Sequence, residues 1–141
     1  MPFKFDGINY LAVVSAGLAT FFLGAVWYTA LFGKLWVQLT GYTEEKIKEL
    51  QAKRPPAVFF GGMIVCYLVL SYAVAVLANS LSITSPIQGA VLGLTLWAGL
   101  AATIGFTAHL AGDRHIGIFF IDSGYQLVYL LLMGGLIGAW R

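Results

Sequence analysis

The feature that most constrains this fold is a set of four long apolar runs, separated by short polar segments. They cover approximately residues 8–32, 57–80, 86–110 and 116–140. A helix needs about 20 apolar residues to cross the hydrocarbon core of a bilayer, so each run is long enough to span it. The first run is also longer than the roughly 7–15 apolar residues of a signal peptide. We therefore expect an all-α integral membrane protein, with residues 1–141 forming one four-span domain.

The composition argues against a water-soluble fold. Of the 141 residues, 60% are hydrophobic and 10% are charged, whereas soluble domains have about 25% charged residues. A chain this short has too small an interior to bury so many apolar side chains, so the surplus must face lipid. The net charge of +2 gives no reason to expect nucleic acid as a partner. We expect membrane lipid as the partner instead.

A polar segment after the first span predicts a short interfacial helix over residues 43–54. Thr43 suits the N-cap, acidic residues follow it, and basic residues stand at the far end, which matches the helix dipole. A partner-docking element is the alternative. Before this segment, Gly33 can end the first helix. Aromatic and basic residues near that exit are typical of a headgroup boundary, and we expect these to be interfacial anchors: Trp27, Tyr28, Lys34 and Trp36.

Small residues recur at helical spacing in three of the spans and predict close helix packing. The first span has one every four residues, and the third and fourth spans each contain a GxxxG pair. The residues are Ala12, Ala16, Thr20 and Gly24, then Gly89 and Gly93, then Gly134 and Gly138. This is more close-packing surface than four short helices need among themselves. We therefore expect a homo-oligomer, either a dimer or a trimer.

The charges between the spans predict an orientation, because cytoplasmic loops carry an excess of Lys and Arg. Four spans leave only Lys4 and Arg141 on one side. The other side has Lys34, Lys46, Lys48, Lys53, Arg54 and Arg114. We therefore expect loop 34–56 and turn 111–115 to be cytoplasmic and both termini to lie outside, in the cytoplasmic membrane of a bacterium.

Asp122 is the sharpest functional pointer, because a carboxylate inside a spanning helix is costly and usually faces protein or water. Helical spacing places Asp122, Gln126 and Tyr129 on one face. With His109 and Tyr67 from neighbouring spans, they are our candidate residues for a polar cavity. Asp122 lies about 9 Å along its helix from the predicted cytoplasmic end, at 1.5 Å per residue. This depth also allows a structural role, such as an interhelical hydrogen bond.

A structural Asp122 can instead form an ion pair at the same boundary, for which the candidates are His109, Lys34 and Arg114. The two histidines beside the turn, His109 and His115, match no standard metal-site spacing, and we expect neither a metal site nor a cofactor. The sequence also contains no nucleophile–base set or nucleotide fingerprint, so it predicts no catalytic residues.

Several stretches resemble a bacterial membrane family catalogued as domain of unknown function 1761. The most specific are Gly24-Ala25-Val26-Trp27-Tyr28 and Leu31-Phe32-Gly33-Lys34-Leu35-Trp36. The others are Asn9-Tyr10-Leu11-Ala12-Val13, Thr43-Glu44-Glu45, Asp122-Ser123-Gly124-Tyr125-Gln126-Leu127 and Met133-Gly134-Gly135. The resemblance covers nearly the whole chain. It implies four spans and supplies no functional residues.

Three functions are compatible with these features. The first is an oligomeric pore or carrier for a small solute or ion, which uses Asp122 and the face it shares with Gln126 and Tyr129. The second is a structural or lipid-binding protein in which Asp122 is a packing partner. The third is a membrane enzyme acting on a lipophilic substrate near Tyr67, His109 and Asp122. Small multidrug carriers have a similar size, but they use a Glu in a first span that has no acid here.

Overall fold

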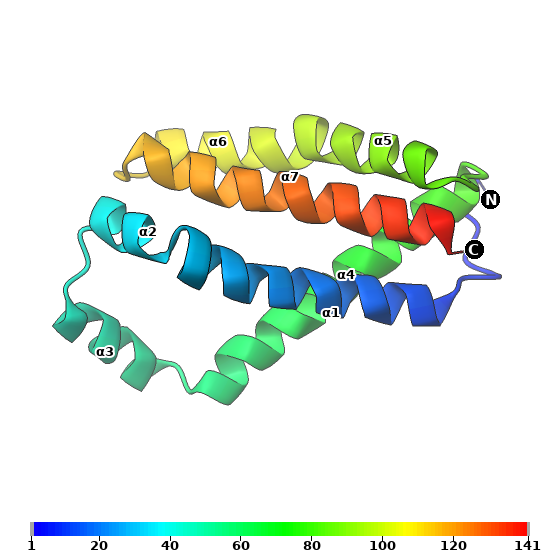
Figure 1. Cartoon of the computed structure of the whole chain (residues 1–141). Helices are drawn as coiled ribbons and strands as arrows, with labels where there is room; N and C mark the ends of the chain where they lie inside the picture. Colours follow the sequence, from blue (N-terminus) through cyan, green and yellow to red (C-terminus); the bar gives the residue numbers. More distant parts are fainter. Residues whose placement is uncertain (1, 141) are drawn as a thin grey trace.

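Four helices in the described part of the chain are long and apolar enough to cross a membrane. The structure is a computed structural model that describes residues 2–140, all of whose regular structure is helical (Figure 1). This confirms the prediction of an all-α fold with four spans. In chain order the spans are α1 (Tyr10–Val26) with its continuation η1 (Trp27–Leu31), α4 (Pro56–Ser80), then α5 (Pro86–Leu96), η2 (Trp97–Ala101) and α6 (Ala102–Ala111) together, and α7 (Ile116–Ala139).

The helix starts follow the local sequence. The Asn9 side chain accepts hydrogen bonds from the backbone N–H groups of Leu11 and Ala12 at the start of α1. Ser85 caps α5 in the same way, and a proline occupies the first turn of α5 and of α4. These starts are local features, because capping depends on residues within one turn of the helix end.

The exit from the first span differs from its prediction. Gly33 does not end a helix but begins α2 (Gly33–Thr40), and the break falls one residue earlier, at Phe32. Gly41, with a φ of 72°, ends α2 in the left-handed conformation that glycine adopts readily. The helix α3 (Glu44–Lys53) follows, with Thr43 as its N-cap. The chain therefore has two short helices between its first two spans where the sequence predicted one.

The last span, α7, is the central helix of the bundle. Its share of buried residues is 39%, compared with 11% for the third span, so α7 contacts protein while the third span is largely at the surface. The α5 segment packs along α7, and α1 and α4 contact other parts of it (Figure 1). Residues on α7 are therefore the ones that face all the other spans.

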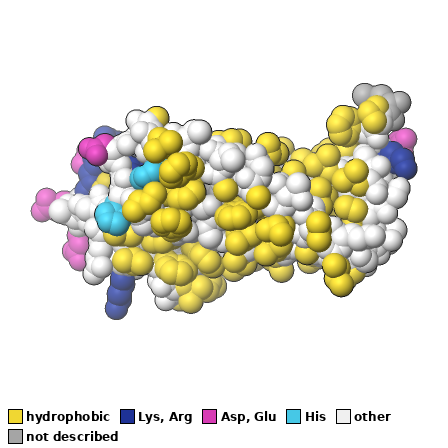
Figure 2. Space-filling model, turned by 90° about the horizontal axis from the view of Figure 1, so that it is seen from above, with side chains coloured by type: hydrophobic (Ala, Val, Ile, Leu, Met, Phe, Trp, Pro, Cys, Tyr) yellow, Lys and Arg dark blue, Asp and Glu magenta, His cyan; other side chains and the backbone are white. Residues whose placement is uncertain are grey.

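The ends of the molecule differ in charge. The two ends of the described chain lie together, while α2, α3 and the turn between α6 and α7 lie at the opposite end (Figure 1). Charged side chains and both histidines gather at the ends of the visible face, and hydrophobic side chains cover the part between them (Figure 2). This distribution fits a membrane protein. Arg141, which entered the orientation argument, lies outside the described residues.

The two GxxxG pairs pack against each other within one chain. A Cβ added at Gly89 would overlap the carbonyl group of Gly134, and one added at Gly93 would overlap the carbonyl group of Leu130. Conversely, a Cβ at Gly134 would overlap the carbonyl of Gly89. The backbones of α5 and α7 therefore touch, which only glycine permits.

The small residues of α1 are also used inside the chain. Ala12, Ala16, Thr20 and Gly24 are all buried, and α1 packs on α4 and α7. The Ser71 hydroxyl on α4 donates a 2.8 Å hydrogen bond to the carbonyl of Val13. The surfaces that suggested a homo-oligomer are thus occupied by the protein's own helices, and the oligomer remains a prediction without that support.

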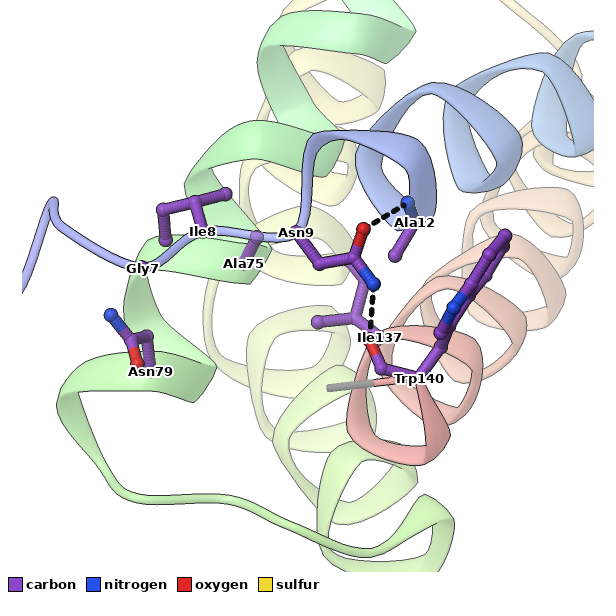
Figure 3. Close-up of a pocket in the computed structure, with 8 residues that line it drawn as sticks. All are labelled: Gly7, Ile8, Asn9, Ala12, Ala75, Asn79, Ile137 and Trp140. Atoms are coloured by element: carbon purple, nitrogen blue, oxygen red, sulfur yellow. Dashed lines mark hydrogen bonds between the residues drawn. The ribbon is translucent and has the colours of Figure 1, made fainter.

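The chain ends are tied together at one end of the bundle. The Asn9 side chain donates a 3.1 Å hydrogen bond to the carbonyl of Trp140 while it caps α1 (Figure 3). The cavity beside it, which also touches Ala75, Asn79 and Ile137, has a volume of about 20 Å³. Such a volume holds about one water molecule, so the helices leave almost no space between them here.

Candidate functional site

A large cavity between the spans, which we call the aromatic cavity, lies at the opposite end of the bundle. Its volume is about 440 Å³. Residues from η1, α2, α4 and α7 line it: Tyr28, Trp36, Phe59, Met63, Tyr67, Asp122, Tyr125, Gln126 and Tyr129. Most of its wall is therefore aromatic, and its polar groups come mainly from α7 and the tyrosine hydroxyls.

Tyrosine rings pack edge to face around this cavity. The ring centroids of Tyr125 and Tyr129 are 4.9 Å apart, and those of Tyr28 and Tyr125 are 5.4 Å apart. Tyr67 on α4 approaches the centroid of Tyr129 within 5.7 Å. The buried hydroxyl of Tyr125 donates a 2.7 Å hydrogen bond to the carbonyl of Thr20, which fixes this ring against α1. The wall of the cavity is thus held by packing and by a buried hydrogen bond.

Asp122 has a neutral partner. The Tyr28 hydroxyl donates a 2.6 Å hydrogen bond to Oδ1 of Asp122, which joins the first span to the last. Within residues 2–140, Asp122 has no Lys, Arg or His nitrogen within 4.0 Å. The structure therefore contains an interhelical hydrogen bond of Asp122, which was one of the two structural alternatives. The ion pairs with His109, Lys34 or Arg114 that the sequence allowed are not formed.

Two tryptophans hold the α7 backbone on either side of Asp122. The indole N–H of Trp27 donates to the carbonyl of Ile121 at 3.1 Å, and that of Trp97 donates to the carbonyl of Ser123 at 2.8 Å. Each tryptophan is the first residue of a π-helical segment, η1 or η2. Such segments are rare and occur frequently at functional sites. The position of Asp122 is thus fixed from two different spans.

A second cavity, which we call the charged cavity, lies on the side of Asp122 away from the aromatic cavity. Its volume is about 160 Å³, and it lies between α6 and α7. Its lining residues are Gly105, Ala108, His109, Arg114, Ile118, Phe119, Asp122, Ser123 and Gln126. It therefore combines a guanidinium, an imidazole, a carboxylate, an amide and a hydroxyl in a small space.

Ser123 is the least satisfied polar group of the charged cavity. Its side chain is 4% exposed, and its Oγ has no hydrogen-bond partner among the described residues. An unsatisfied buried hydroxyl costs roughly 1–3 kcal/mol. Because Trp97 bonds the backbone carbonyl of the same residue, the position of Ser123 is fixed, and its hydroxyl is enclosed by protein.

The candidate residues for a polar cavity are divided between these two spaces. Asp122 and Gln126 line both cavities, Tyr67 and Tyr129 line the aromatic cavity, and His109 lines the charged cavity. Tyr67 and His109 therefore face Asp122 from opposite sides. The enzyme hypothesis placed its substrate near Tyr67, His109 and Asp122, but within one protomer these three residues do not line one common cavity.

Sequence reasoning missed two residues of the site, Trp97 and Ser123. Trp27, which was expected to anchor the membrane interface, has a half-buried indole that bonds α7, and its role as an anchor stays a prediction. One signal for Trp97 was present, because it follows Gly89 and Gly93 at the same four-residue spacing. Ser123 had no such signal, because a serine in an apolar helix is ordinary. Among the described residues, no group of three His, Cys, Asp or Glu residues is placed to hold a metal ion.

The fold and these two cavities define a small polytopic membrane protein whose polar groups surround its central helix. A family model described as Protein of unknown function (DUF1761) matches residues 11–138. Because this match covers most of the chain, the chain belongs to that family, as its sequence resemblance predicted. Neither a curated protein nor a solved structure matches the chain.

Proposed function

We propose that this protein is a membrane carrier that binds a small organic cation in the aromatic cavity, with Asp122 as its counter-ion. The observation that carries the proposal is a carboxylate without a cationic partner, set in the wall of an aromatic cavity. A carboxylate at membrane depth is costly when it is unpaired. A bound cation would supply the missing opposite charge.

The shape and chemistry of the aromatic cavity support this ligand class. Its volume of about 440 Å³ falls within the roughly 300–1,000 Å³ of small-molecule sites. Six of its nine lining residues are Phe, Tyr or Trp, and a cation over such rings gains about 0.5–2 kcal/mol per contact. A strongly hydrated inorganic ion would gain little from these rings, so an alkylammonium ion fits the wall better.

The arrangement of the spans supports a carrier rather than an open pore. The aromatic cavity lies at the end with α2 and α3, whereas the spans pack closely at the other end, where α5 and α7 touch through their glycines. A carrier alternates between such one-sided states. The charge asymmetry of the loops places the aromatic cavity on the cytoplasmic side, and this sidedness belongs to the proposal.

Cation binding by purified protein in lipid nanodiscs tests the proposal. Tetraethylammonium serves as the probe, and isothermal titration calorimetry measures its affinity. We expect Asp122→Asn to weaken binding by roughly tenfold or more, because an ion pair in a partly desolvated site is lost. The matched control is Asp113→Asn, which removes an exposed carboxylate in the α6–α7 turn and should leave the affinity unchanged.

Uptake into proteoliposomes separates a carrier from a binding protein. Radiolabelled tetraethylammonium should accumulate faster with the wild-type protein than with Asp122→Asn. Saturable binding without uptake would support the cation-binding site but contradict the carrier function. Equal binding by the wild type and Asp122→Asn would contradict both the proposed site and the carrier function.

A structural role for Asp122 is the second candidate, favoured by its hydrogen bond from Tyr28. In this case Asp122→Asn lowers the free energy of unfolding without changing cation affinity. The carrier proposal expects little loss of stability, because an Asn side chain keeps an acceptor oxygen for the Tyr28 hydroxyl. Unfolding in mixed micelles with an increasing fraction of SDS distinguishes the two.

A further inference from the structure

We infer that the charged cavity is a second binding site, which takes a small zwitterion with an ammonium group and a carboxylate, such as a short amino acid. This site lies between α6 and α7, and its proposal does not depend on the cation proposed for the aromatic cavity. The observation behind it is that two opposite charges line the charged cavity without forming an ion pair. Arg114 and Asp122 both line this cavity of about 160 Å³, yet no ion pair within 4.0 Å joins them.

The inner part of the cavity suits an ammonium group. Two α7 residues contribute acceptor oxygens there: the carboxylate of Asp122 and the side-chain amide of Gln126. An ammonium group has three N–H donors and no acceptor. The Asp122 carboxylate, which is also the counter-ion proposed for the aromatic cavity, would gain an opposite charge here, so the two ligands would compete for it.

The mouth of the cavity suits a carboxylate. Arg114 is exposed in the turn before α7, and its planar guanidinium can bind a carboxylate through two hydrogen bonds. His109, at the end of the third span, lines the same space. A ligand that enters with its ammonium group first therefore places both of its charges against opposite ones.

The order of the charges favours a dissolved ligand over a lipid headgroup. Asp122 lies six residues into α7, which is about 9 Å at 1.5 Å per residue, whereas Arg114 precedes the helix. The site therefore has its acidic end deep and its basic end at the mouth. In an aminophospholipid the phosphate lies toward the membrane and the amine toward water, which is the reverse order.

The volume limits the ligand to a small molecule. The cavity's volume of about 160 Å³ lies below the roughly 300–1,000 Å³ of sites for drug-sized ligands. Glycine and β-alanine are small enough for it. They also differ by one carbon in the separation of their charges, so together they measure how far apart the two ends of the site lie.

Equilibrium binding of radiolabelled glycine and β-alanine to the protein in nanodiscs tests the inference. We expect saturable binding of at least one of them. Methylamine and acetate, which each carry one of the two charged groups, should compete at least about tenfold more weakly, because each leaves one end of the site unpaired. Phosphatidylethanolamine in the nanodisc should not compete, and displacement of the probe by this lipid would overturn the choice of a dissolved ligand.

Variants identify the basic end of the site. Arg114→Gln should weaken zwitterion binding by roughly tenfold, whereas Arg114→Lys should keep part of it, because a charge but not a bidentate contact remains. Arg54→Gln is the control, because Arg54 is equally exposed but lies at the end of α3.

The outcomes separate this inference from the proposed function. Arg114→Gln does not touch the aromatic cavity and should leave tetraethylammonium binding unchanged. If neither zwitterion binds saturably, or if Arg114→Gln binds it as the wild type does, the second site is wrong while the cation site can still stand. If the zwitterion binds and tetraethylammonium does not, the second site stands without the proposed function.

Discussion

The two halves of α7 are packed in different ways. From Leu130 to Gly138, α7 lies against α5 with backbone touching backbone, and the cavity between Asn9 and Trp140 holds about 20 Å³. From Ile116 to Gln126, the same helix is bordered by cavities of about 160 and 440 Å³. We call these regions the glycine-packed half and the cavity half of the bundle.

The other spans show the same division. In α4 the buried residues lie between Ser71 and Ala78, and none lies in the first half of the helix. In the third span, α5 buries Gly89 and Gly93, while η2 and α6 bury none of their residues. The contrast therefore belongs to the whole bundle and not to α7 alone.

Side-chain size explains the difference. Glycine, alanine, serine and threonine let helices approach closely in the glycine-packed half. In the cavity half, large aromatic rings such as those of Trp27, Tyr28 and Tyr67 stand between the helices and leave space beside Asp122. The comparison teaches that close packing in one half of the bundle is combined with cavities in the other half.

The largest effect is expected from a methyl group added in the glycine-packed half. Gly93→Ala should lower the free energy of unfolding by about 2–3 kcal/mol, because the new Cβ overlaps the Leu130 backbone, which no rotamer change can relieve. Unfolding in mixed micelles with an increasing fraction of SDS measures the change. A loss below about 0.5 kcal/mol would mean that α5 and α7 do not touch in the membrane.

An intermediate effect is expected at the boundary between the halves. Trp97→Phe keeps most of the ring volume but removes the N–H that donates to the Ser123 carbonyl. It should lower the free energy of unfolding by about 1 kcal/mol, the net contribution of one hydrogen bond. Trp140→Phe is the control, because Trp140 is 41% exposed at the chain end. Equal losses in the two variants would contradict a specific role for Trp97.

The smallest effect is expected from the same methyl group placed in the cavity half. Gly61→Ala, in the first half of α4, should raise the free energy of unfolding by about 0.5–1 kcal/mol, because a Cβ at Gly61 has no other atom within 4 Å and alanine restricts the unfolded chain. The same SDS titration measures it. A loss as large as that of Gly93→Ala would show that α4 packs more tightly than the structure indicates, and would remove the contrast between the halves.

Part of the candidate site was predictable from α7 alone. Asp122, Gln126 and Tyr129 were placed on one face by helical spacing, and the structure sets all three beside a cavity. Their partners were not predictable, because the sequence offered cations for Asp122 while the chain supplies the Tyr28 hydroxyl. The choice depends on how α1 is rotated against α7, which no local pattern specifies.

The sequence by itself determined the number of spans, the helix caps and the presence of glycine pairs, because these depend on residues close together in the chain. Only the tertiary structure decided that Gly89 and Gly93 meet Gly134 within one chain, and that Asp122 separates two different cavities. The physical reason is that a spanning helix is surrounded by lipid instead of water. Lipid tails are as apolar as a protein core, so the apolar faces of a spanning helix do not reveal which one faces protein. That choice is made by steric fit and by hydrogen bonds, such as those from Trp27 and Trp97 to α7.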